Sequence, residues 1–289
     1  MTVSHSVPAR YIILPEREYV NTLFYVYKGA GICYCFTEGM ATDMEETVKY
    51  FEHITALLKT VLETQAQTIE RVAKMVVDTS QAGNKIFVFG CSHAGILAQE
   101  AFYRTGGLVI MNPILARGLT CDVVPVTDTS VLERKAEYAQ EIFKEYALEA
   151  GDLLIISSVS GRNGVPVEMG IAAAEAGVST VAITNLTYSK ASPSRHPSGK
   201  RLFEVCPVVI DNCGCIGDAA MNIDGFGGKV APTSTITGAA IINSICAEAV
   251  AEFIKRGIEP PVFMSANLDG GDEYNAKIME KYKAVIKYM

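Results

Sequence analysis

The sequence predicts an α/β protein with three layers, in which helices cover both faces of a sheet of five parallel strands. Short apolar runs rich in β-forming residues recur at 85–90, 108–111, 153–157, 180–184 and 208–211. Runs of this length are typical of strands buried on both faces, as they are in parallel sheets. Amphipathic segments long enough for a helix, such as 131–147, separate most of these runs. This alternation of strand and helix predicts the α/β/α architecture.

Further helices are expected before and after the sheet. Thr42 and Glu45 form the pattern of a capping box, and apolar residues recur after them at helical spacing. A second helix is expected to continue through Met75. After Pro232 an apolar stripe predicts a long helix, and a last helix is expected over 273–288. The sheet should therefore have a helical extension on its N-terminal side.

A chain of 289 residues is long enough for one large α/β domain and short for two independent enzyme domains, so one core is expected. The expected parts are an atypical N-terminal segment (1–39), N-terminal helices (40–81), the α/β domain (82–260), and a C-terminal segment with a helix (261–289). Residues 1–39 show no sustained periodicity. One hypothesis is that the native protein begins at Met40 or Met44.

The net charge of −7 and the pI near 5.2 argue against nucleic acid or an anionic membrane as the main partner, since either needs clustered lysine and arginine. No run of 18 apolar residues occurs, and the N-terminus lacks the pattern of a signal peptide. The expected location is the cytoplasm. An anionic ligand must then be bound by local groups, against the charge of the whole protein.

Neither a metal nor an organic cofactor is expected. Cys33 with Cys35 and Cys213 with Cys215 form C-x-C pairs, whereas four-ligand zinc sites usually show two spaced C-x-x-C pairs. The segment 90–95, G-C-S-H-A-G, lacks the G-x-G-x-x-G fingerprint of nicotinamide-binding folds and the lysine of a nucleoside triphosphate loop. The eight cysteines are irregularly spaced and are expected to be free thiols.

The segment 158–163, S-V-S-G-R-N, carries the strongest indication of a binding site. It lies between the predicted strand 153–157 and a predicted helix. A turn at the start of a helix presents unpaired N–H groups and the positive end of the helix dipole, which suits a phosphate. The hydroxyls of Ser158 and Ser160 add donors, and Gly161 lets the backbone approach closely. Because such residues also cap helices, capping is an equal alternative for this segment alone.

This arrangement resembles the phosphate loop of the sugar isomerase (SIS) family. The match consists of a strand, S-x-S-G-x-[NT], a helix and a strand after E-A-G-V-S-T, and it extends over most of residues 44–289. In that family the first strand usually ends G-x-G-x-S. Here the corresponding residues are Gly90 to Ala94, so the second glycine and the serine are both replaced, and Ser92 supplies a hydroxyl one position earlier.

A second segment, A-P-T-S-T at 231–235, is similar to the P-T-x-S-T that lines the sugar-phosphate site in pentose-phosphate isomerases of the superfamily. A hydroxyl-rich helix start is the alternative interpretation. The order of the whole chain most closely resembles a bacterial subgroup of phosphosugar-binding SIS proteins. The resemblance implies a flavodoxin-like sheet, a phosphorylated sugar as ligand, and a homodimer or homotetramer. The phosphosugar-binding residues it implies are Ser92, Ser158, Ser160, Gly161, Asn163, Thr233, Ser234 and Thr235.

Aldose–ketose isomerisation moves a proton between adjacent carbons through an enediol, so it requires an acid–base group near those carbons. Glu100 is the first choice as base, and His93, seven residues earlier, is the second. His196, in a basic loop, is a third candidate that would belong to a lid. A solvated glutamate, a surface histidine and a solvated loop are the respective alternatives. Glu168 and Glu248 are secondary candidates.

The leading hypothesis is a sugar-phosphate isomerase. The first alternative is a module that binds a phosphosugar without converting it, since the acid–base candidates are less specific than the phosphate loops. The second alternative is an enzyme of another reaction type, because SIS proteins also include etherases and deaminases. For the segment 265–272, S-A-N-L-D-G-G-D, no role is predicted.

Overall fold

The computed structural model of the chain describes residues 45–289, and Tyr50–Met289 form one compact unit. Its centre is a five-stranded sheet in the order β2-β1-β3-β4-β5, with every pair parallel. The strands are β1 (Ile86–Gly90), β2 (Met111–Ile114), β3 (Leu153–Ser157), β4 (Ser179–Thr184) and β5 (Val208–Asp211). The predicted parallel sheet and its flavodoxin-like strand order are confirmed.

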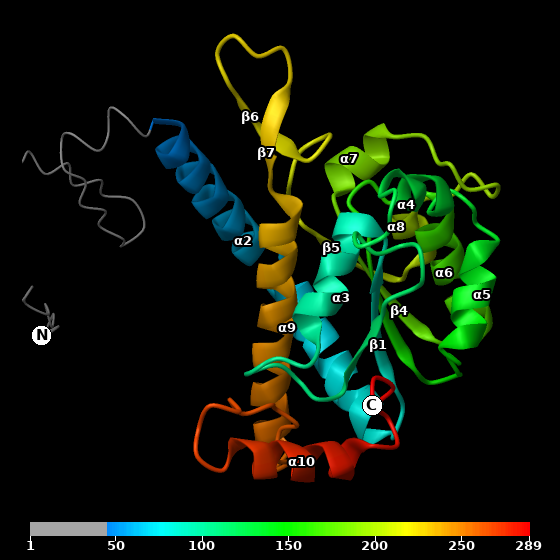
Figure 1. The fold of residues 1–289 in the computed structure, drawn as a ribbon, viewed down its shortest axis with the longest axis vertical. Helices are drawn as coiled ribbons and strands as arrows, with labels where there is room; N and C mark the ends of the chain where they lie inside the picture. Colours follow the sequence, from blue (N-terminus) through cyan, green and yellow to red (C-terminus); the bar gives the residue numbers. More distant parts are fainter. Residues whose placement is uncertain (1–44) are drawn as a thin grey trace, which may run out of the picture. The chain divides into compact units, whose positions relative to one another are not determined.

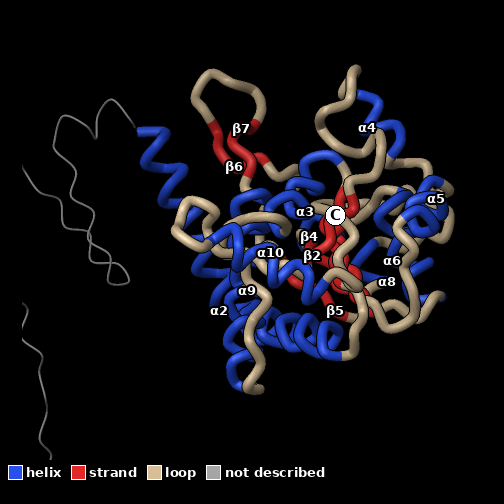
Figure 2. The backbone as a smooth tube through the Cα atoms, turned by 60° about the horizontal axis from the view of Figure 1, so that its bottom comes forward, coloured by secondary structure: helices blue, strands red, loops and turns tan. Residues whose placement is uncertain are grey.

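Helices cover both faces of the sheet (Figures 1 and 2). One face carries α2 (Glu45–Gln81), α3 (Ile96–Ala101) and α9 (Ser234–Lys255), and the other carries α5 (Tyr138–Glu145), α6 (Gly164–Glu175) and α8 (Leu202–Val205). The remaining described elements are the 3-10 turn η1 (Ser92–Gly95) and the helices α4 (Thr127–Leu132), α7 (Leu186–Ala191) and α10 (Gly271–Tyr282).

The alternation of side chains along the strands divides the core into two layers. Ile86 and Val88 of β1 pack toward α2, α3 and α9, whereas Phe87 and Phe89 pack toward α5, α6 and α8. All four side chains are buried, with at most 1% of their surface exposed. Successive residues of a strand point to opposite faces, so a continuous apolar run is what a sheet covered on both sides requires.

Three elements differ from the sequence-based expectation. The two helices expected over 40–81 are one continuous helix, α2, because neither glycine nor proline interrupts the apolar repeat before Gly83. The strand expected at 108–111 begins only at Met111, since Leu108 pairs instead with Val262 as an isolated antiparallel bridge. A hairpin of β6 (Ala219–Asn222) and β7 (Lys229–Pro232) precedes α9 and was not predicted.

The helix α9, which the sequence predicted, is long and apolar enough to cross a membrane by those two criteria alone. Its residues Ile241, Ile245 and Phe253 are buried in the layer that α9 forms with α2 and α3. A core helix passes the same criteria. Its apolar stripe is therefore explained by packing against the sheet.

A buried carboxylate connects the amino ends of the neighbouring strands β1 and β3. Asp152, which is 1% exposed, accepts hydrogen bonds from the backbone N–H of Lys85 at 2.8 Å and of Glu149 at 3.0 Å. The Lys85 ammonium lies 3.6 Å from the same carboxylate and 2.7 Å from that of Glu149. Asp152, the residue before β3, is thus bonded to Lys85, the residue before β1.

We predict that Asp152→Ala lowers the free energy of unfolding by about 3 kcal/mol, because it leaves buried donors and a half-compensated lysine without their acceptor. Glu149→Ala is the matched control, since that side chain is 71% exposed and its ion pair is worth less than about 1 kcal/mol. Urea unfolding of both variants measures the difference. Equal effects of the two substitutions would contradict this assignment.

Candidate functional site

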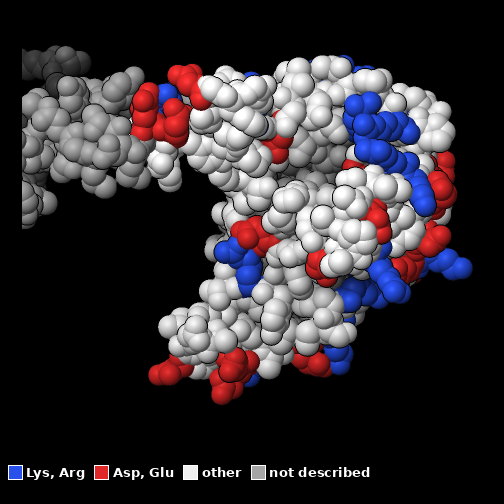
Figure 3. Space-filling model, turned by 45° about the horizontal axis from the view of Figure 1, so that its top comes forward, with Lys and Arg blue, Asp and Glu red and all other residues white. Residues whose placement is uncertain are grey.

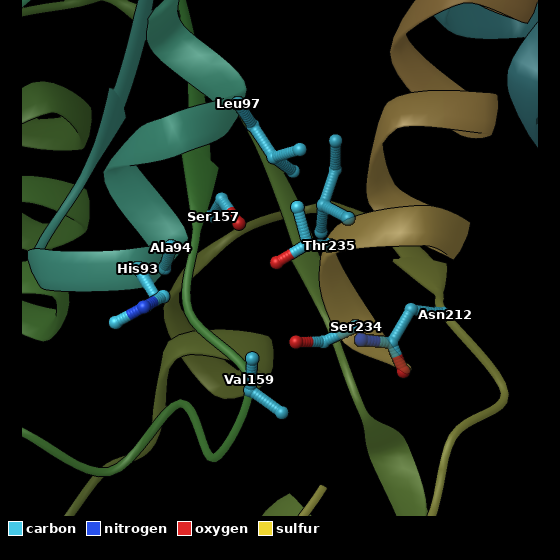
Figure 4. A pocket seen from close by; sticks show the side chains of 9 residues that line it. His93, Ala94, Leu97, Ser157, Val159, Asn212, Ser234 and Thr235 are labelled. Atoms are coloured by element: carbon cyan, nitrogen blue, oxygen red, sulfur yellow. The ribbon is translucent and has the colours of Figure 1, made fainter. Parts of the chain in front are cut away.

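A pocket opens at the carboxyl edge of the sheet, between the turns that follow β1 and β3 (Figure 4). Strand order reverses between β1 and β3, and the crevice at such a switch point is where ligands bind in open parallel sheets. The residues that line the pocket are His93, Ala94, Leu97, Ser157, Val159, Ile183, Asn212, Ser234 and Thr235. The turns after β1 and β3 and the start of α9 therefore meet in one pocket.

The turn after β1 is tight. A Cβ atom at Gly90 would lie 2.5 Å from the carbonyl oxygen of Ala94, so only glycine fits there. Ser92 has a φ of +53°, and its N–H donates to the carbonyl of Leu119 at 2.7 Å. His93 is exposed, its Nδ1 lies 3.7 Å from Sγ of Cys121, and its ring points away from Ser234 (Figure 4).

The turn after β3 is held by its backbone, which leaves its side chains free for other contacts. The carbonyl of Val159 accepts hydrogen bonds from Thr184 Oγ1 at 3.1 Å and from the N–H of Asn185 at 2.9 Å. Gly161 has a φ of +59°, and a Cβ atom there would lie 2.9 Å from Oγ of Ser189. Glycine is thus required at the position where the backbone passes under α7.

Asn163 occupies the N-cap position of α6, yet its side chain makes no capping hydrogen bond. Its amide nitrogen donates to Oε1 of Glu133, and its amide oxygen accepts a hydrogen bond from Nη1 of Arg195 at 2.9 Å. The capping alternative is therefore not realised by this side chain. No side chain caps the start of α6, where the N–H of Val165 instead donates to the backbone carbonyl of Glu133 at 2.9 Å.

Glu133 lies between the two turns and contacts both. Oε2 of Glu133 is 3.5 Å from Oγ of Ser92, and Oε1 accepts from Asn163. Burial raises the pKa of the Glu133 carboxyl, although the hydrogen bond from Ser92 and the charges of Arg134 and Arg195 lower it in part. Two donors that the sequence assigned to phosphate are thus bonded to a carboxylate of the chain itself.

A second carboxylate occupies the start of α9. Oδ1 of Asp218 accepts from the N–H groups of Thr233 at 3.1 Å and Ser234 at 2.9 Å, and Oδ2 accepts from Oγ of Ser234 at 2.6 Å. Asp218 precedes β6 and adopts a φ of +68°. It thus acts as the helix cap, and it makes this edge of the pocket anionic.

Asn212 supplies an amide beside Asp218. Its Oδ1 accepts hydrogen bonds from Nδ2 of Asn185 at 3.1 Å and from the N–H of Gly214 at 3.0 Å. The side-chain oxygen is therefore fixed, and its NH₂ group is oriented by these two contacts. Thr235 lines the pocket next to it.

The acid–base candidates are not brought together. His93 lines the pocket, whereas Glu100 does not: its carboxylate is bound by Arg104 and by Nδ2 of Asn243, at 2.8 Å. Asn243 lies nine residues beyond Ser234, which is about 13 Å along α9. Glu100, the first choice as base, thus lies outside the pocket, whereas His93, the second choice, lines it.

His196 lies in a buried pair rather than at the pocket. Its Nε2 is 2.8 Å from Oε2 of Glu168. The other carboxylate oxygen of Glu168, Oε1, accepts a hydrogen bond from Gln140 at 2.7 Å. The His196 side chain is 6% exposed. Glu248, on an exposed part of α9, lies beside Glu70 of α2, away from the pocket. The secondary candidate Glu168 is thus a partner that holds the His196 loop against α6.

Other expectations concern the rest of the chain. Residues 265–272 form the turn before α10 and the first two residues of that helix, and they do not line the pocket. Among residues 45–289 no group of three His, Cys, Asp or Glu side chains is placed to hold a metal ion. The hypotheses on residues 1–39 and on a start at Met40 or Met44 lie outside the described part of the chain.

Sequence reasoning missed Glu133, Asp218 and Asn212. Glu133 belongs to a polar stretch after α4 and carries no motif, so its role depends on the fold alone. Asp218 and Asn212 stand among turn residues, D-N-C-G-C-I-G-D at 211–218, where aspartate and asparagine are common for local reasons. The segment 211–218 lies shortly before α9 in the sequence, and this proximity was the signal that could have indicated its contact with the start of that helix.

Several known proteins resemble this chain. A model of the SIS domain matches residues 49–185. The chain is 45% identical to the UPF0309 protein of Shouchella clausii over 246 residues, which cover 85% of this chain and 100% of that protein. It is 38% identical to the UPF0309 protein of Streptomyces coelicolor over 248 residues, 86% of this chain and 99% of that one.

Among solved structures, a phosphoheptose isomerase from Francisella tularensis is similar with a TM-score of 0.49 and 16% identity, over 72% of this chain and 97% of that chain. The relatives match nearly along their whole length at high identity. The chain therefore belongs to the UPF0309 family and carries an SIS domain.

Proposed function

We propose that the pocket at the β1/β3 switch point binds a phosphorylated sugar. The observation that carries this proposal is the meeting of two separate polar turns and the start of α9 in one pocket. The donors are hydroxyls, amides and backbone N–H groups, which bind a dianion without adding charge of their own. The SIS domain model that matches the chain supports the same ligand class.

The phosphate belongs at the start of α6 rather than at the start of α9. The α6 edge offers the half-buried hydroxyl of Ser160 and the backbone N–H of Gly164, the first residue of α6. The α9 edge already carries the carboxylate of Asp218, which repels a dianion. Asp218, which is held by Thr233 and Ser234, then binds the sugar end of the ligand. Its carboxylate oxygens accept hydrogen bonds from sugar hydroxyls.

The reaction we propose is the interconversion of an aldose and a ketose phosphate. A base removes the proton from the carbon next to the carbonyl, the enediol forms, and the proton returns to the neighbouring carbon. His93 is the candidate base on the pocket lining, and rotation about its Cα–Cβ bond turns its imidazole from Cys121 toward the pocket. The Asn212 amide is placed to donate to the substrate oxygen, on which negative charge develops.

A binding module without catalysis is the second candidate, because Glu100 is engaged by Arg104 and Asn243 and His196 by Glu168. Incubation of the protein with a panel of aldose and ketose phosphates in D₂O separates the two functions. An isomerase incorporates deuterium at the carbon next to the carbonyl, whereas a binding module leaves the sugar unlabelled. Cleavage of an ether bond, or release of ammonia from an amino sugar phosphate, would indicate another SIS reaction.

A homo-oligomer in the cytoplasm completes the proposal. Phe51 and Leu62 of α2 are 68% and 67% exposed, and large apolar side chains in that state on one helix are typical of an interface. Burial of this helix against another subunit would remove them from water. The absence of a strongly basic net charge fits a ligand that is small rather than a nucleic acid.

We predict that Ser160→Ala weakens the binding of a sugar phosphate by about 1 to 3 kcal/mol, because a hydroxyl that donates to a charged oxygen is lost. Titration calorimetry with the sugar phosphate that gives the strongest signal measures the change. Ser244→Ala, an exposed serine of α9, is the matched control and should leave the affinity unchanged. An unchanged affinity in Ser160→Ala would remove the turn after β3 from the site.

We predict that Glu133→Gln becomes more stable relative to the wild type as the pH rises. Since burial raises the pKa of Glu133 in the folded state, its protonated form is favoured there. Below the ordinary glutamate pKa of about 4.3 the folded carboxyl carries no charge, and ionisation at higher pH reduces the stability of the wild type only. Chemical unfolding between pH 4 and pH 8 measures the difference in the free energy of unfolding.

The control for Glu133→Gln is Glu137→Gln, an exposed position on the same segment. A difference between Glu133→Gln and wild type that stays constant over this pH range would show that the carboxyl ionises freely in the folded protein. The same variant should bind inorganic phosphate more tightly at pH 8, because a negative charge between Ser92 and Asn163 is removed.

A further inference from the structure

Three arginines from separate segments gather beside the turn after β3. Arg162 is part of that turn, Arg134 follows α4, and Arg195 lies in the loop between α7 and α8. The N–H of Arg195 donates to the carbonyl of Arg162 at 2.8 Å, and a Cβ atom at Gly164 would lie 2.5 Å from the carbonyl of Arg134. Figure 3 shows basic side chains gathered on one side of the molecule.

These three guanidinium groups have no matching carboxylates. Within residues 45–289, no carboxylate oxygen lies within 4.0 Å of a side-chain nitrogen of Arg134, Arg162 or Arg195, although other basic residues form such pairs. Burial and the charges of Arg162 and Arg134 lower the pKa of Arg195. The nearest acid, Glu133, is engaged by Asn163. Within residues 45–289, the cluster therefore forms no direct ion pair, although the protein as a whole is acidic.

Arg162 adds a second, independent sign of a missing partner. Within the described chain, its Nε is a fully buried donor without a hydrogen-bond acceptor. Nearly all buried polar groups in proteins are hydrogen-bonded, so an exception in the turn after β3 calls for an acceptor that the chain does not supply. A guanidinium with a free donor edge is suited to a planar or tetrahedral oxyanion.

A series of hydrogen bonds connects the cluster to the pocket. Ser92, next to the pocket residue His93, contacts Glu133, Glu133 accepts from Asn163, and Asn163 accepts from Arg195. Arg195 is thus connected to the turn after β1 through Asn163 and Glu133. A phosphate bound at the Ser160 hydroxyl and the start of α6 leaves the exposed guanidinium groups of Arg134 and Arg195 without an anion.

We propose that Arg134, Arg162 and Arg195 bind a second anionic group of the phosphosugar, so that the natural ligand is a sugar phosphate with an additional phosphate or carboxylate. This inference rests on the proposed function and names the class of its ligand. The first phosphate is held by neutral donors at the start of α6, and the second group is held by charge at the rim. Ligands with a single phosphate then occupy only part of the site.

The test compares ligands that carry one anionic group with ligands that carry two. Titration calorimetry measures the affinity for fructose 6-phosphate and fructose 1,6-bisphosphate, and for glucose 6-phosphate and 6-phosphogluconate. The variants are Arg162→Gln and Arg195→Gln, and the control is Arg71→Gln, an exposed arginine of α2. In at least one pair, we expect the ligand with two anionic groups to bind ten-fold or more tightly than the ligand with one. Each site variant should abolish most of that advantage, whereas the control should retain it.

The outcomes separate this inference from the proposed function. A preference for the bisphosphate identifies phosphate as the second group, and a preference for 6-phosphogluconate identifies a carboxylate. Equal affinities within both pairs, or a site variant that weakens both members of a pair equally, would overturn the second anion site and leave phosphosugar binding in place. If none of the four ligands binds at millimolar concentration, the proposed function itself fails, and this inference fails with it.

Discussion

The parallel sheet, buried on both faces, is the constraint on which the site depends. Its strands place every carboxyl end at one edge, so the turns after β1, β3 and β5 must meet there whatever their sequence. Because both faces are covered by helices, that edge is where polar residues of the sheet's connections reach solvent. The core determines where the pocket is, and the residues of the turns determine what it binds.

The donors of this edge are bonded to carboxylates of the same chain. Glu133 joins the turns after β1 and β3, and Asp218 caps α9. Unpaired buried donors are unfavourable, so a protein with donors arranged for an anion is more stable when it supplies acceptors of its own. Glu133 therefore offers Asn163 the acceptor that a bound anion would otherwise supply.

The fold was predictable because its pattern is repeated and strong. Five apolar runs and the long stripe of α9 specify the sheet and one covering helix, and the S-x-S-G-R-N turn was found where the structure has it. Boundaries were less predictable, since Leu108 pairs with a distant residue and α2 continues through a region without a stop signal. The partners of Asn163 and Ser234 were not predictable, because Glu133 and Asp218 are distant or unremarkable in sequence and are selected by tertiary packing.

The charges at the pocket are distributed asymmetrically, and this asymmetry orients a ligand. The Asp218 carboxylate lies at the α9 edge, and the arginine cluster lies beyond the α6 edge, with His93 and Asn212 on the lining. A sugar phosphate aligned with its phosphate toward α6 presents its neutral hydroxyls to Asp218, whereas the reverse orientation brings two anions together in a partly desolvated space. If the pocket binds a phosphosugar as proposed, this orientation brings the sugar carbons to His93 and Asn212. Charge would then select the same orientation whether the protein converts its ligand or only binds it.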